Sequence, residues 1–283
     1  MSHHQEPIHF LNGRFVKEDG LTVSVRDIGF SRGYAVFDFL ISYPYHRPFM
    51  LSRHIDRLFA SADLVGLALP WSKAKIAEWV MRTMDANKDP GEKAIKIIVS
   101  GGTSHSMLPS LDGPTIAIII DPHRPFPREY YEKGAGVITV RHTRHIPRAK
   151  TNNYIEGVRQ TQAAAKIGAI EPLYYDDSQI LEGSNSNIFA LIGGKLLTPK
   201  SNILLGITRS VLLDILSLPV PIEVADFSRD QLSEAKEVFF TGSNKEVMPI
   251  TKIDGEAVGG GRVGNITKEV MRQFREFTLS DAW

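Results

Sequence analysis

The chain has 283 residues, of which 42% are hydrophobic and 23% charged, as in an ordinary soluble globular protein. Its 33 basic and 32 acidic residues nearly cancel, which argues against a surface for nucleic acid or an anionic membrane. The absence of cysteine excludes disulfides, thiolate metal sites and cysteine nucleophiles. The polar N-terminus lacks an apolar signal core, and the longest apolar run, Ile116–Ile120, is too short to span a bilayer, so we expect a soluble cytoplasmic protein.

Strand-like segments dominate the beginning of the chain, and Asn12-Gly13 is typical of the turn in a hairpin. The strands expected here are Pro7–Phe10, Arg14–Val16, Val23–Val25, Val36–Tyr43 and Phe49–Leu51. Apolar residues then recur at helical spacing, which predicts a helix over Ser52–Leu69 with Ser52 as its N-cap, and a second helix over Ser72–Asp85. Two further strands are expected, at Ala94–Ser100 and Thr115–Ile120.

The segment Asp121–Pro127 contains three prolines in seven residues. Proline at this density is unfavourable for a helix and for a central strand, so we expect an extended linker and place the domain boundary here. The predicted organisation is an N-terminal domain at residues 1–121, a linker at 122–132 and a C-terminal domain at 133–283.

The C-terminal part mixes strands and helices without a regular alternation, so the α+β class fits better than a doubly wound sheet. The predicted strands are Val137–His142, Leu173–Tyr175, Ile180–Glu182, Ile188–Leu191, Lys195–Leu197 and Val238–Thr241. The predicted helices are Tyr154–Lys166, Thr208–Leu216 and Thr267–Phe277. Asn153 and Glu156 form a capping signal for the first of these helices, and Thr208 is expected to cap the second.

An amine and a carboxylate stand at the ends of predicted strands in this C-terminal part. Lys150 lies between a strand and a helix, where we expect it to face a cleft. The positive charges of Arg144 and Arg148 would favour its neutral, nucleophilic form. Glu182 precedes the polar turn 183–187 and is expected to face the same cleft. The ordinary alternatives are a solvated surface lysine and a turn acid exposed to water.

Two turns further on are suited to an anion. Leu205–Thr208 leads into a predicted helix, whose first N–H groups and dipole attract negative charge, and Gly206 allows close approach of the backbone. The turn 241–244 offers a hydroxyl, a glycine and an amide for a second phosphate contact. A simple capped helix is the ordinary alternative. A lysine, an acid and a phosphate cup are together what a protein needs to hold pyridoxal phosphate.

Other patterns do not predict a site. Gly259–Gly264 satisfies G-x-G-x-x-G but lies in no βαβ unit, so we interpret it as a flexible turn. His142 and His145 have no carboxylate nearby, and no metal site is predicted. The basic run Arg141–Lys150 lacks interleaved aromatic residues, so no nucleic-acid partner is predicted.

The chain resembles the class IV, fold-type IV pyridoxal-phosphate enzymes, which include branched-chain aminotransferases, D-amino-acid aminotransferases and aminodeoxychorismate lyases. The resemblance runs nearly end to end and is carried by Asn12-Gly13, Val25–Phe30, His54–Leu58, Arg148–Tyr154, Leu181–Asn187 and Gly206–Arg209. It implies a small N-terminal α/β domain and a larger C-terminal β-barrel-like domain, with the cofactor in the cleft. It also implies a homodimer in which N-terminal loops complete the neighbour's site.

The resemblance implies that Lys150 forms a Schiff base with pyridoxal 5'-phosphate and shuttles a proton between Cα and C4′. It implies that Glu182 pairs with the pyridine nitrogen and that Tyr154 binds the ring phenolate oxygen. The other cofactor-binding residues that it implies are Arg53, Ile207, Thr208 and Ser243 at the phosphate and Leu204 under the ring. The implied reaction moves an amino group between an amino acid, of the D-amino-acid or branched-chain type, and a 2-oxo acid.

The residues expected to bind substrate differ from those of typical D-amino-acid aminotransferases, because the loop after Ile95–Ser100 lacks their Arg-x-His pair. Phe37 stands where those enzymes have tyrosine and branched-chain enzymes phenylalanine, and Asp38 replaces the usual glutamate of the latter. Lys96 falls where branched-chain enzymes place an arginine. Arg32 is similar to an arginine that a variant group of D-amino-acid transaminases supplies from the partner subunit. We predict that Arg32, Phe37 and Lys96 bind substrate, with a loop salt bridge or a strand-edge lysine as ordinary alternatives.

The lyase reaction, which would release pyruvate from aminodeoxychorismate, is the alternative enzymatic function. Lyases of this family typically carry threonine where Asp38 stands and His-Leu-Asn-Arg after the lysine. Here Thr151–Tyr154 follows the lysine, which favours the transaminase. A non-catalytic small-molecule-binding protein on the same scaffold is the third hypothesis.

Overall fold

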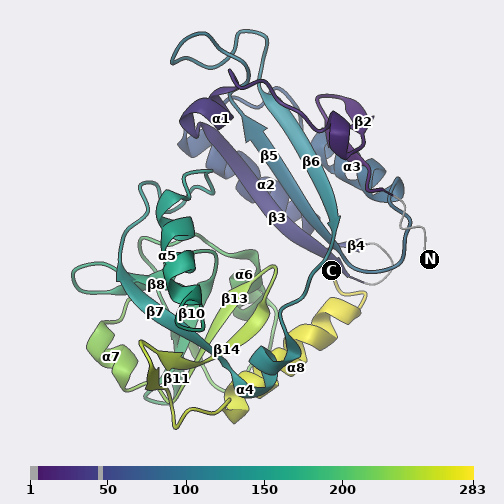
Figure 1. Cartoon of the computed structure of the whole chain (residues 1–283). Coiled ribbons are helices and arrows are strands. Elements are labelled where there is room, and N and C mark those ends of the chain that lie inside the picture. Colours follow the sequence, from purple (N-terminus) through teal and green to yellow (C-terminus); the bar gives the residue numbers. More distant parts are fainter. Residues whose placement is uncertain (1–5, 44–46) are drawn as a thin grey trace. The chain divides into compact units, whose positions relative to one another are not determined.

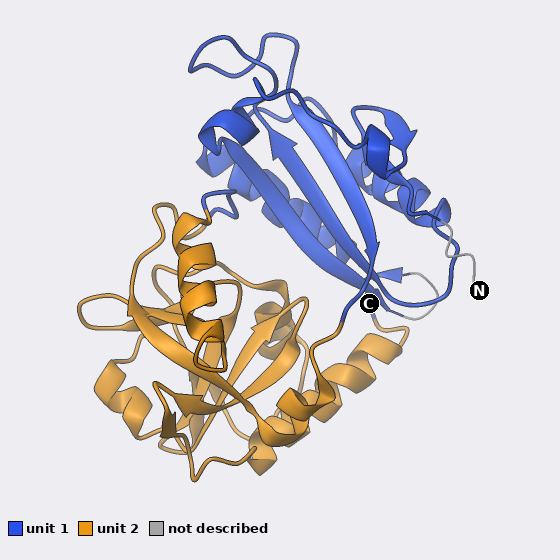
Figure 2. Ribbon diagram, viewed as in Figure 1, with its two compact units in different colours: residues 1–124, 149–153, 283 blue, residues 125–148, 154–282 orange. Residues whose placement is uncertain are grey.

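The computed structural model describes residues 6–43 and 47–283, which form two compact units (Figure 2). Unit 1 comprises the described residues up to Arg124, together with Ala149–Asn153 and Trp283. Unit 2 comprises Pro125–Arg148 and Tyr154–Ala282. A segment of five residues that includes Lys150 thus leaves unit 2 and joins unit 1. The first five residues of the polar N-terminus lie outside the described residues.

Unit 1 is built on a six-stranded antiparallel sheet with the order β2-β1-β6-β5-β3-β4. Its strands are β1 (His9–Leu11), β2 (Arg14–Val16), β3 (Ala35–Tyr43), β4 (Arg47–Pro48), β5 (Lys93–Ser100) and β6 (Thr115–Pro122). Its helices are α1 (Ile28–Arg32), α2 (Leu51–Leu64) and α3 (Lys73–Asp85), with a short 3-10 turn at Glu18–Gly20. Figure 1 shows α2 and α3 on one face of this sheet.

The core of unit 1 follows from the alternation of side chains along β5 and β6. Ile95 and Ile97 of β5 and Ile116 and Ile118 of β6 are fully buried, because every second residue of a strand points to the same face. The apolar faces of α2 and α3 cover them with Ile55, Leu58, Ile76 and Val80. The residues between them on the strands, such as Lys96, point to the opposite face.

Several elements predicted for unit 1 are confirmed. Asn12 and Gly13 have φ angles of 47° and 89°, which suits the tight turn that joins β1 to β2. The helix predicted over Ser72–Asp85 is α3, and Ser72 is found to be its N-cap, accepting a bond from the Lys75 amide. The predicted strand at Val23–Val25 is wrong: within the described residues this segment pairs with no strand, and its valines are exposed.

The boundaries of α2 and of the strand before it differ from the prediction. The N-cap of α2 is Met50, with a φ of 49°, and not Ser52. The helix ends at Leu64 and not Leu69, because Gly66 follows with a φ of 70° that a helix cannot continue. The strand expected at Phe49–Leu51 lies earlier, as β4, and α2 already includes Leu51.

Unit 2 is built on a nine-stranded mixed sheet with the order β12-β11-β10-β13-β14-β7-β8-β9 and β15 paired to β14. The strands are β7 (Ala135–Arg141), β8 (Ala169–Tyr175), β9 (Ile180–Gly183), β10 (Asn187–Ile192), β11 (Lys195–Thr198), β12 (Ile222–Val224), β13 (Glu237–Gly242), β14 (Glu246–Ile253) and β15 (Glu256–Ala257). The helices are α4 (Arg128–Lys133), α5 (Ile155–Ala165), α6 (Ile207–Asp214), α7 (Arg229–Ser233) and α8 (Asn265–Leu279). The pairs β7–β8, β7–β14 and β11–β12 are parallel and the rest antiparallel.

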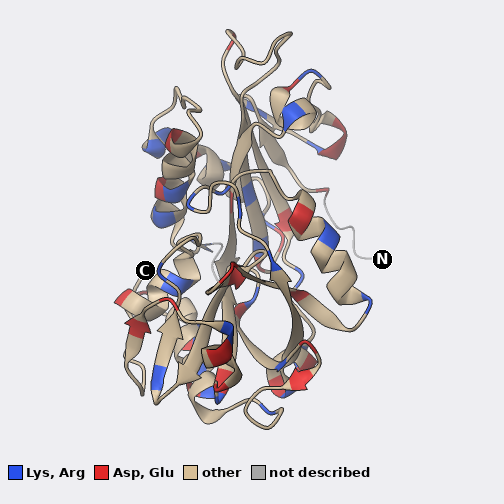
Figure 3. Ribbon diagram, turned by 90° about the vertical axis from the view of Figure 1, so that its left-hand side faces the viewer, with Lys and Arg blue, Asp and Glu red and all other residues tan. Residues whose placement is uncertain are grey.

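The core of unit 2 consists of the buried side chains of its central strands, among them Leu173, Ile188, Phe240 and Met248. Strands and helices are mixed in both units without a regular alternation, so the predicted α+β class is confirmed. Acidic and basic residues are interspersed on the ribbon of each unit (Figure 3), in keeping with the balanced composition.

Two predicted helix caps in unit 2 are wrong. The N-cap of α5 is Tyr154, and no side chain caps it, because Glu156 instead accepts bonds from Arg159 and Gln160. The N-cap of α6 is Gly206, and Thr208 lies inside the first turn without capping. Helix α4 occupies part of the range 122–132 that was expected to be an extended linker.

None of the helices in the described residues combines the length and the apolar character that a bilayer-spanning segment requires. The cytoplasmic location stays a prediction.

Candidate active site

The backbone on either side of Lys150 is held by unit 1. The Phe37 amide donates to the Lys150 carbonyl at 2.9 Å, and the Asn152 amide donates to the Ala35 carbonyl at 3.0 Å, so the segment extends the sheet beside β3. The Lys150 amide donates to Ser61 Oγ on α2 at 3.0 Å. Lys150 is therefore fixed by a strand on one side and a helix on the other, and is not a surface lysine.

The side chain of Lys150 is only 8% exposed and lies against an aromatic ring. Its Nζ atom is 4.6 Å from the centre of the Phe37 ring, and the Nζ atom of Lys96 is 5.1 Å from the same centre. Burial lowers the pKa of Lys96. The structure thus brings Lys150 together with two of the three residues predicted to bind substrate.

A buried charge cluster lies one residue further along β3. The Asp38 carboxylate is fully buried, accepts two bonds from Arg57 at 2.7 and 2.9 Å, and lies 2.6 Å from His54 Nδ1. Burial raises the pKa of Asp38, but Arg57 and His54 outweigh it and hold this pKa well below its ordinary value. Burial lowers the pKa of His54.

His54 and Arg57 were not predicted to belong to the site, although their spacing of three residues places them on one face of a helix. Ser61 connects this face to Lys150, because its hydroxyl donates to the Arg57 carbonyl at 2.8 Å and accepts from the Lys150 amide. Arg53, the predicted phosphate residue, is half-buried one turn before Arg57. The family motif His54–Leu58 contains both His54 and Arg57, and it was the one feature of the sequence from which their role could have been predicted.

Arg32, the third predicted substrate residue, lies at the end of α1. Its side chain is exposed and donates to the Ser31 carbonyl at 3.2 Å. The helix is anchored by Asp27, which accepts bonds from the Gly29 amide at 2.7 Å and from Ser100 Oγ at 2.8 Å. The fold of unit 1 therefore leaves the Arg32 side chain exposed and does not bring it to Lys150.

In unit 2, the Glu182 carboxylate is 4% exposed and accepts bonds on both oxygens. Oε1 accepts from Arg144 Nε at 2.8 Å and from Nη2 at 2.6 Å. Oε2 accepts from the Leu204 amide at 2.9 Å and from Asn187 Nδ2 at 3.4 Å. The Arg144 guanidinium, which was expected to add positive charge near Lys150, is paired with this carboxylate.

The turn before α6 is tied to Glu182 through Asn187. Asn187 Nδ2 donates to the Leu204 carbonyl at 2.8 Å, and a Cβ atom at Gly206 would lie 2.1 Å from Asn187 Oδ1. A side chain at this position would therefore force Asn187 or the turn to move. Ile207 and Thr208 follow in the first turn of α6, both nearly buried, where backbone N–H groups lack acceptors within the helix.

Two buried hydroxyls in unit 2 lack a hydrogen-bond partner within the described part of the chain, Ser184 Oγ and Thr241 Oγ1. Ser184 lies in the turn after Glu182, and Thr241 pairs with Asn187 across β10 and β13. Gly242, next to Thr241, approaches the same turn, since its Cβ position is 3.2 Å from the Asn185 carbonyl. Ser243, a predicted phosphate residue, follows and is half-buried.

Unpartnered buried hydroxyls are rare, because a buried polar group without a bond costs about 1 to 3 kcal/mol. Together with the first turn of α6, they form the donor set that an oxyanion such as a phosphate ester needs. The residues of unit 2 thus offer polar donors of the kind that the phosphate of a pyridoxal phosphate needs, and a buried carboxylate, Glu182, of the kind that its ring nitrogen needs. Tyr154, half-buried at the start of α5, and Leu204 lie in the same unit.

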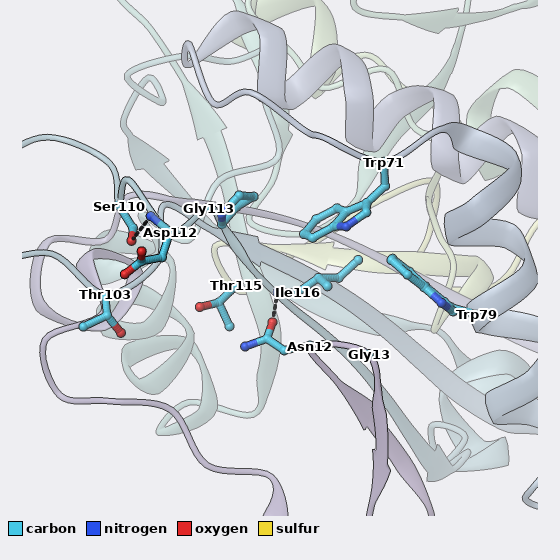
Figure 4. A pocket seen from close by; sticks show the side chains of 11 residues that line it. Asn12, Gly13, Trp71, Trp79, Thr103, Ser110, Asp112, Gly113, Thr115 and Ile116 are labelled. Atoms are coloured by element: carbon cyan, nitrogen blue, oxygen red, sulfur yellow. Dashed lines mark hydrogen bonds between the residues drawn. The ribbon is translucent and has the colours of Figure 1, made fainter.

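A separate pocket of about 450 Å³ lies in unit 1 (Figure 4). Trp71 and Trp79 form one side and Ser110 and Asp112 the other. Of the described residues that line this pocket, none is predicted to bind cofactor or substrate.

Comparison with known proteins identifies relatives that match nearly the whole chain. The family model "Amino-transferase class IV" matches residues 35–253. The D-alanine aminotransferase of Staphylococcus epidermidis is 30% identical, with 96% of this chain and 98% of the relative covered. A putative branched-chain-amino-acid aminotransferase of Methanocaldococcus jannaschii is 34% identical, with 94% and 95% covered.

Among solved structures, the branched-chain aminotransferase of the thermophilic archaeon Thermoproteus uzoniensis, determined with norvaline, superimposes with a TM-score of 0.87. It is 27% identical, and 97% of this chain and 95% of that chain are covered. The predicted fold-type IV architecture is thereby confirmed. The chain belongs to the class IV amino-transferases, a family of pyridoxal-phosphate-dependent enzymes.

Proposed function

We propose that the protein transfers an amino group between an amino acid and a 2-oxo acid, with pyridoxal 5'-phosphate bound covalently to Lys150. The observation that carries this proposal is the setting of Lys150, a nearly buried amine whose backbone is fixed by β3 and α2. An amine held in this way is preorganised to react, whereas a surface lysine is free to move.

The residues predicted from the sequence supply the other contacts of the cofactor. Glu182 is the partner of the ring nitrogen, and Tyr154 binds the phenolate oxygen. The phosphate contacts are Arg53, Ile207, Thr208 and Ser243, and Leu204 supports the ring. The cofactor supplies an electron-withdrawing ring that stabilises negative charge at the substrate α-carbon.

The chain's own residues divide the remaining work. With the cofactor bound, Lys150 would accept the proton of the substrate α-carbon and would return it to C4′ of the cofactor, two atoms further on. Phe37 places an apolar wall against this amine, which excludes water from its vicinity. Glu182, ionised and held at both oxygens, keeps a proton on the ring nitrogen.

The substrate is an amino acid of the D-amino-acid or branched-chain type, as the names of the two kinds of relative suggest. Lys96 binds its α-carboxylate, because the Lys96 ammonium lies against the same aromatic ring as the reactive amine. Phe37 contacts the substrate beside the reacting amine.

A homodimer completes the site. Exposed apolar side chains lie on α1 and the segment before it and on the loop between β5 and β6, namely Val25, Phe30, Met107, Leu108 and Leu111. Hydrogen bonds from the Ile28 amide to the Gly102 carbonyl and from the Ser104 amide to the Arg26 carbonyl join these segments. We assign this surface to a second copy of the chain, with Arg32 reaching the carboxylate of the partner's substrate.

The Lys150→Ala variant tests the main proposal, with Lys166→Ala, an exposed lysine, as its control. The first variant should lose the visible absorbance of lysine-bound pyridoxal phosphate and most turnover, and the control should keep both. Half-reactions with D- and L-amino acids identify the donor. Normal turnover in Lys150→Ala would refute the assignment, and pyruvate release from aminodeoxychorismate without an added 2-oxo acid would indicate the lyase.

Hybrid dimers test the role of Arg32. A Lys150→Ala subunit paired with an Arg32→Ala subunit contains one intact site only if Arg32 acts on the neighbouring subunit. Activity should therefore reappear on mixing the two variants. If mixing restores nothing although hybrid dimers form, Arg32 acts within its own subunit or not at all.

A further inference from the structure

We propose that Arg144 is a positioning residue, which holds the Glu182 carboxylate ready for the ring nitrogen of pyridoxal phosphate. This inference rests on the proposed function, in which Glu182 is the partner of that nitrogen. Arg144 itself touches neither cofactor nor substrate in this role.

The geometry is that of a fixed, charge-assisted pair. Arg144 Nε and Nη2 both donate to Glu182 Oε1, at 2.8 and 2.6 Å. Arg144 is 14% exposed and the Glu182 side chain 5% exposed, so solvent does not compete strongly for either group. Two donors from a planar guanidinium fix direction as well as distance, unlike the single contact of an ammonium.

The second carboxylate oxygen is held from another direction. Oε2 accepts from the Leu204 amide at 2.9 Å, and Asn187 Nδ2 lies 3.4 Å from it. Because separate parts of the chain hold the two oxygens, the carboxylate cannot rotate without breaking a bond. A fixed acceptor loses no rotational entropy when a ring N–H is presented to it.

The charge of Arg144 is needed as much as its geometry. A buried carboxylate without a counter-charge is unfavourable and tends to take up a proton. A protonated Glu182 would present a donor, or a weak acceptor, to the ring nitrogen. An arginine is always charged, so it supplies this counter-charge at every working pH of an enzyme.

The guanidinium makes one further contact, within its own loop. Arg144 Nη2 donates to the Pro147 carbonyl as well as to Glu182. This bond to the backbone limits the rotation of the guanidinium, so that its donors stay directed at the carboxylate.

The test compares two cofactors that differ at a single atom. Pyridoxal phosphate and its 1-deaza analogue share the aldehyde and the phosphate, but only the first has a ring nitrogen to meet Glu182. We measure dissociation constants of both for the wild type, Arg144→Met, Arg144→Lys and Glu182→Gln. Arg148→Met is the matched control, because Arg148 is exposed in the same segment.

Arg144→Met should weaken pyridoxal phosphate binding about 10-fold or more, the usual effect of losing a hydrogen bond to a charged group. It should leave binding of the 1-deaza analogue within about twofold of the wild type. Glu182→Gln should show the same pattern, and Arg148→Met should leave both constants unchanged. Arg144→Lys keeps the charge without the paired donors and should fall in between, which provides a second test if Arg144→Met does not fold.

Equal weakening for both cofactors would overturn the inference, since Arg144 would then only support the fold. Unchanged binding of pyridoxal phosphate by Arg144→Met would overturn it as well. In either case the proposed function stands, provided that Lys150→Ala behaves as expected. A wild-type protein that binds no pyridoxal phosphate would overturn both.

Discussion

The Nζ atom of Lys150 lies 4.6 Å from the centre of the Phe37 ring, so this nearly buried amine rests against an aromatic face. Lys96 approaches the same ring from the neighbouring strand, at 5.1 Å. Phe37 and Lys96 come from β3 and β5, and Lys150 from a segment more than fifty positions further along the chain. The sheet of unit 1 is what brings the three together.

We predict that Lys96→Gln raises KM for the amino acid about 10- to 100-fold, as expected when a carboxylate loses a charged hydrogen-bond donor. The effect on kcat should be smaller. Lys75→Gln, at an exposed position on α3, should change neither constant. Steady-state kinetics decide this, and an unchanged KM in Lys96→Gln would remove this lysine from the substrate site.

The pH dependence of substrate binding follows from the same residue. Burial lowers the pKa of Lys96 below its ordinary value of 10.5. Its charge is therefore present below the lowered pKa and is lost as the pH rises through it, so KM should rise in alkaline buffer. Lys96→Arg keeps its charge to higher pH, and its profile should stay flat where that of the wild type rises.

Asp38→Asn is predicted to destabilise unit 1 by about 3 to 5 kcal/mol at neutral pH, because the change leaves the Arg57 guanidinium without its buried carboxylate. Urea unfolding measures the loss. Asp56→Asn is the control. Asp56 lies next to Arg57 on α2, and its ion pair with Lys73 is exposed and contributes little.

The acid sensitivity of the protein should change in this variant too. The pKa of Asp38 in the folded state lies below its ordinary value of 3.8, so its stabilising contribution is complete above that value. The contribution is lost as the pH falls through the folded-state pKa. The free energy of unfolding should therefore depend less on pH below about 4 in Asp38→Asn than in the wild type. Parallel slopes would contradict this.

Gly206→Ala should weaken pyridoxal phosphate binding by about 10-fold, since its Cβ would meet Asn187 Oδ1 at 2.1 Å and push the start of α6 away from Glu182. Gly136→Ala serves as the control, because its nearest neighbour would be 3.7 Å away. Equilibrium dialysis distinguishes the two. Equal affinities would show that the turn can relax around the added methyl group.

Lys245→Met should destabilise unit 2 by about 3 to 5 kcal/mol, because Lys245 and Glu171 form an ion pair at 2.9 Å in which both side chains are 1% exposed. The double variant with Glu171→Leu should recover part of this loss, since it removes both charges. Thermal unfolding of the single and double variants measures the difference. A double variant no more stable than Lys245→Met would mean that the pair supports more than its own charges.

Local patterns predicted much of the fold. The Asn12-Gly13 turn, the strands now seen as β5 and β6 and the helix predicted over Ser72–Asp85 each depend on neighbouring residues, and each is confirmed. Strand β14 was missed because Pro249 interrupts its pattern, although the strand pairs with β13 and β7 on its two sides. Only the partners of this strand reveal it.

The candidate site also divides into residues that local patterns predicted and contacts that only the folded chain reveals. Lys150, Glu182 and Gly206 were predicted from their positions at the ends of elements and from family motifs. The partners of Asp38 and of Glu182 were not, because His54, Arg57 and Arg144 become neighbours only when distant parts of the chain fold together. Charge along the sequence did not indicate that Arg144 pairs with Glu182.

The return of Ala149–Asn153 to the first unit has a consequence for biosynthesis. The acceptor at Ala35 and the donor at Phe37 leave the ribosome more than a hundred residues before their partners at Asn152 and Lys150. During synthesis, Ala35 and Phe37 of β3 therefore lack these two hydrogen bonds until the segment with Lys150 has been made. Lys150 is therefore among the last residues to take its place in the first unit, long after the strand that holds its backbone has been synthesised.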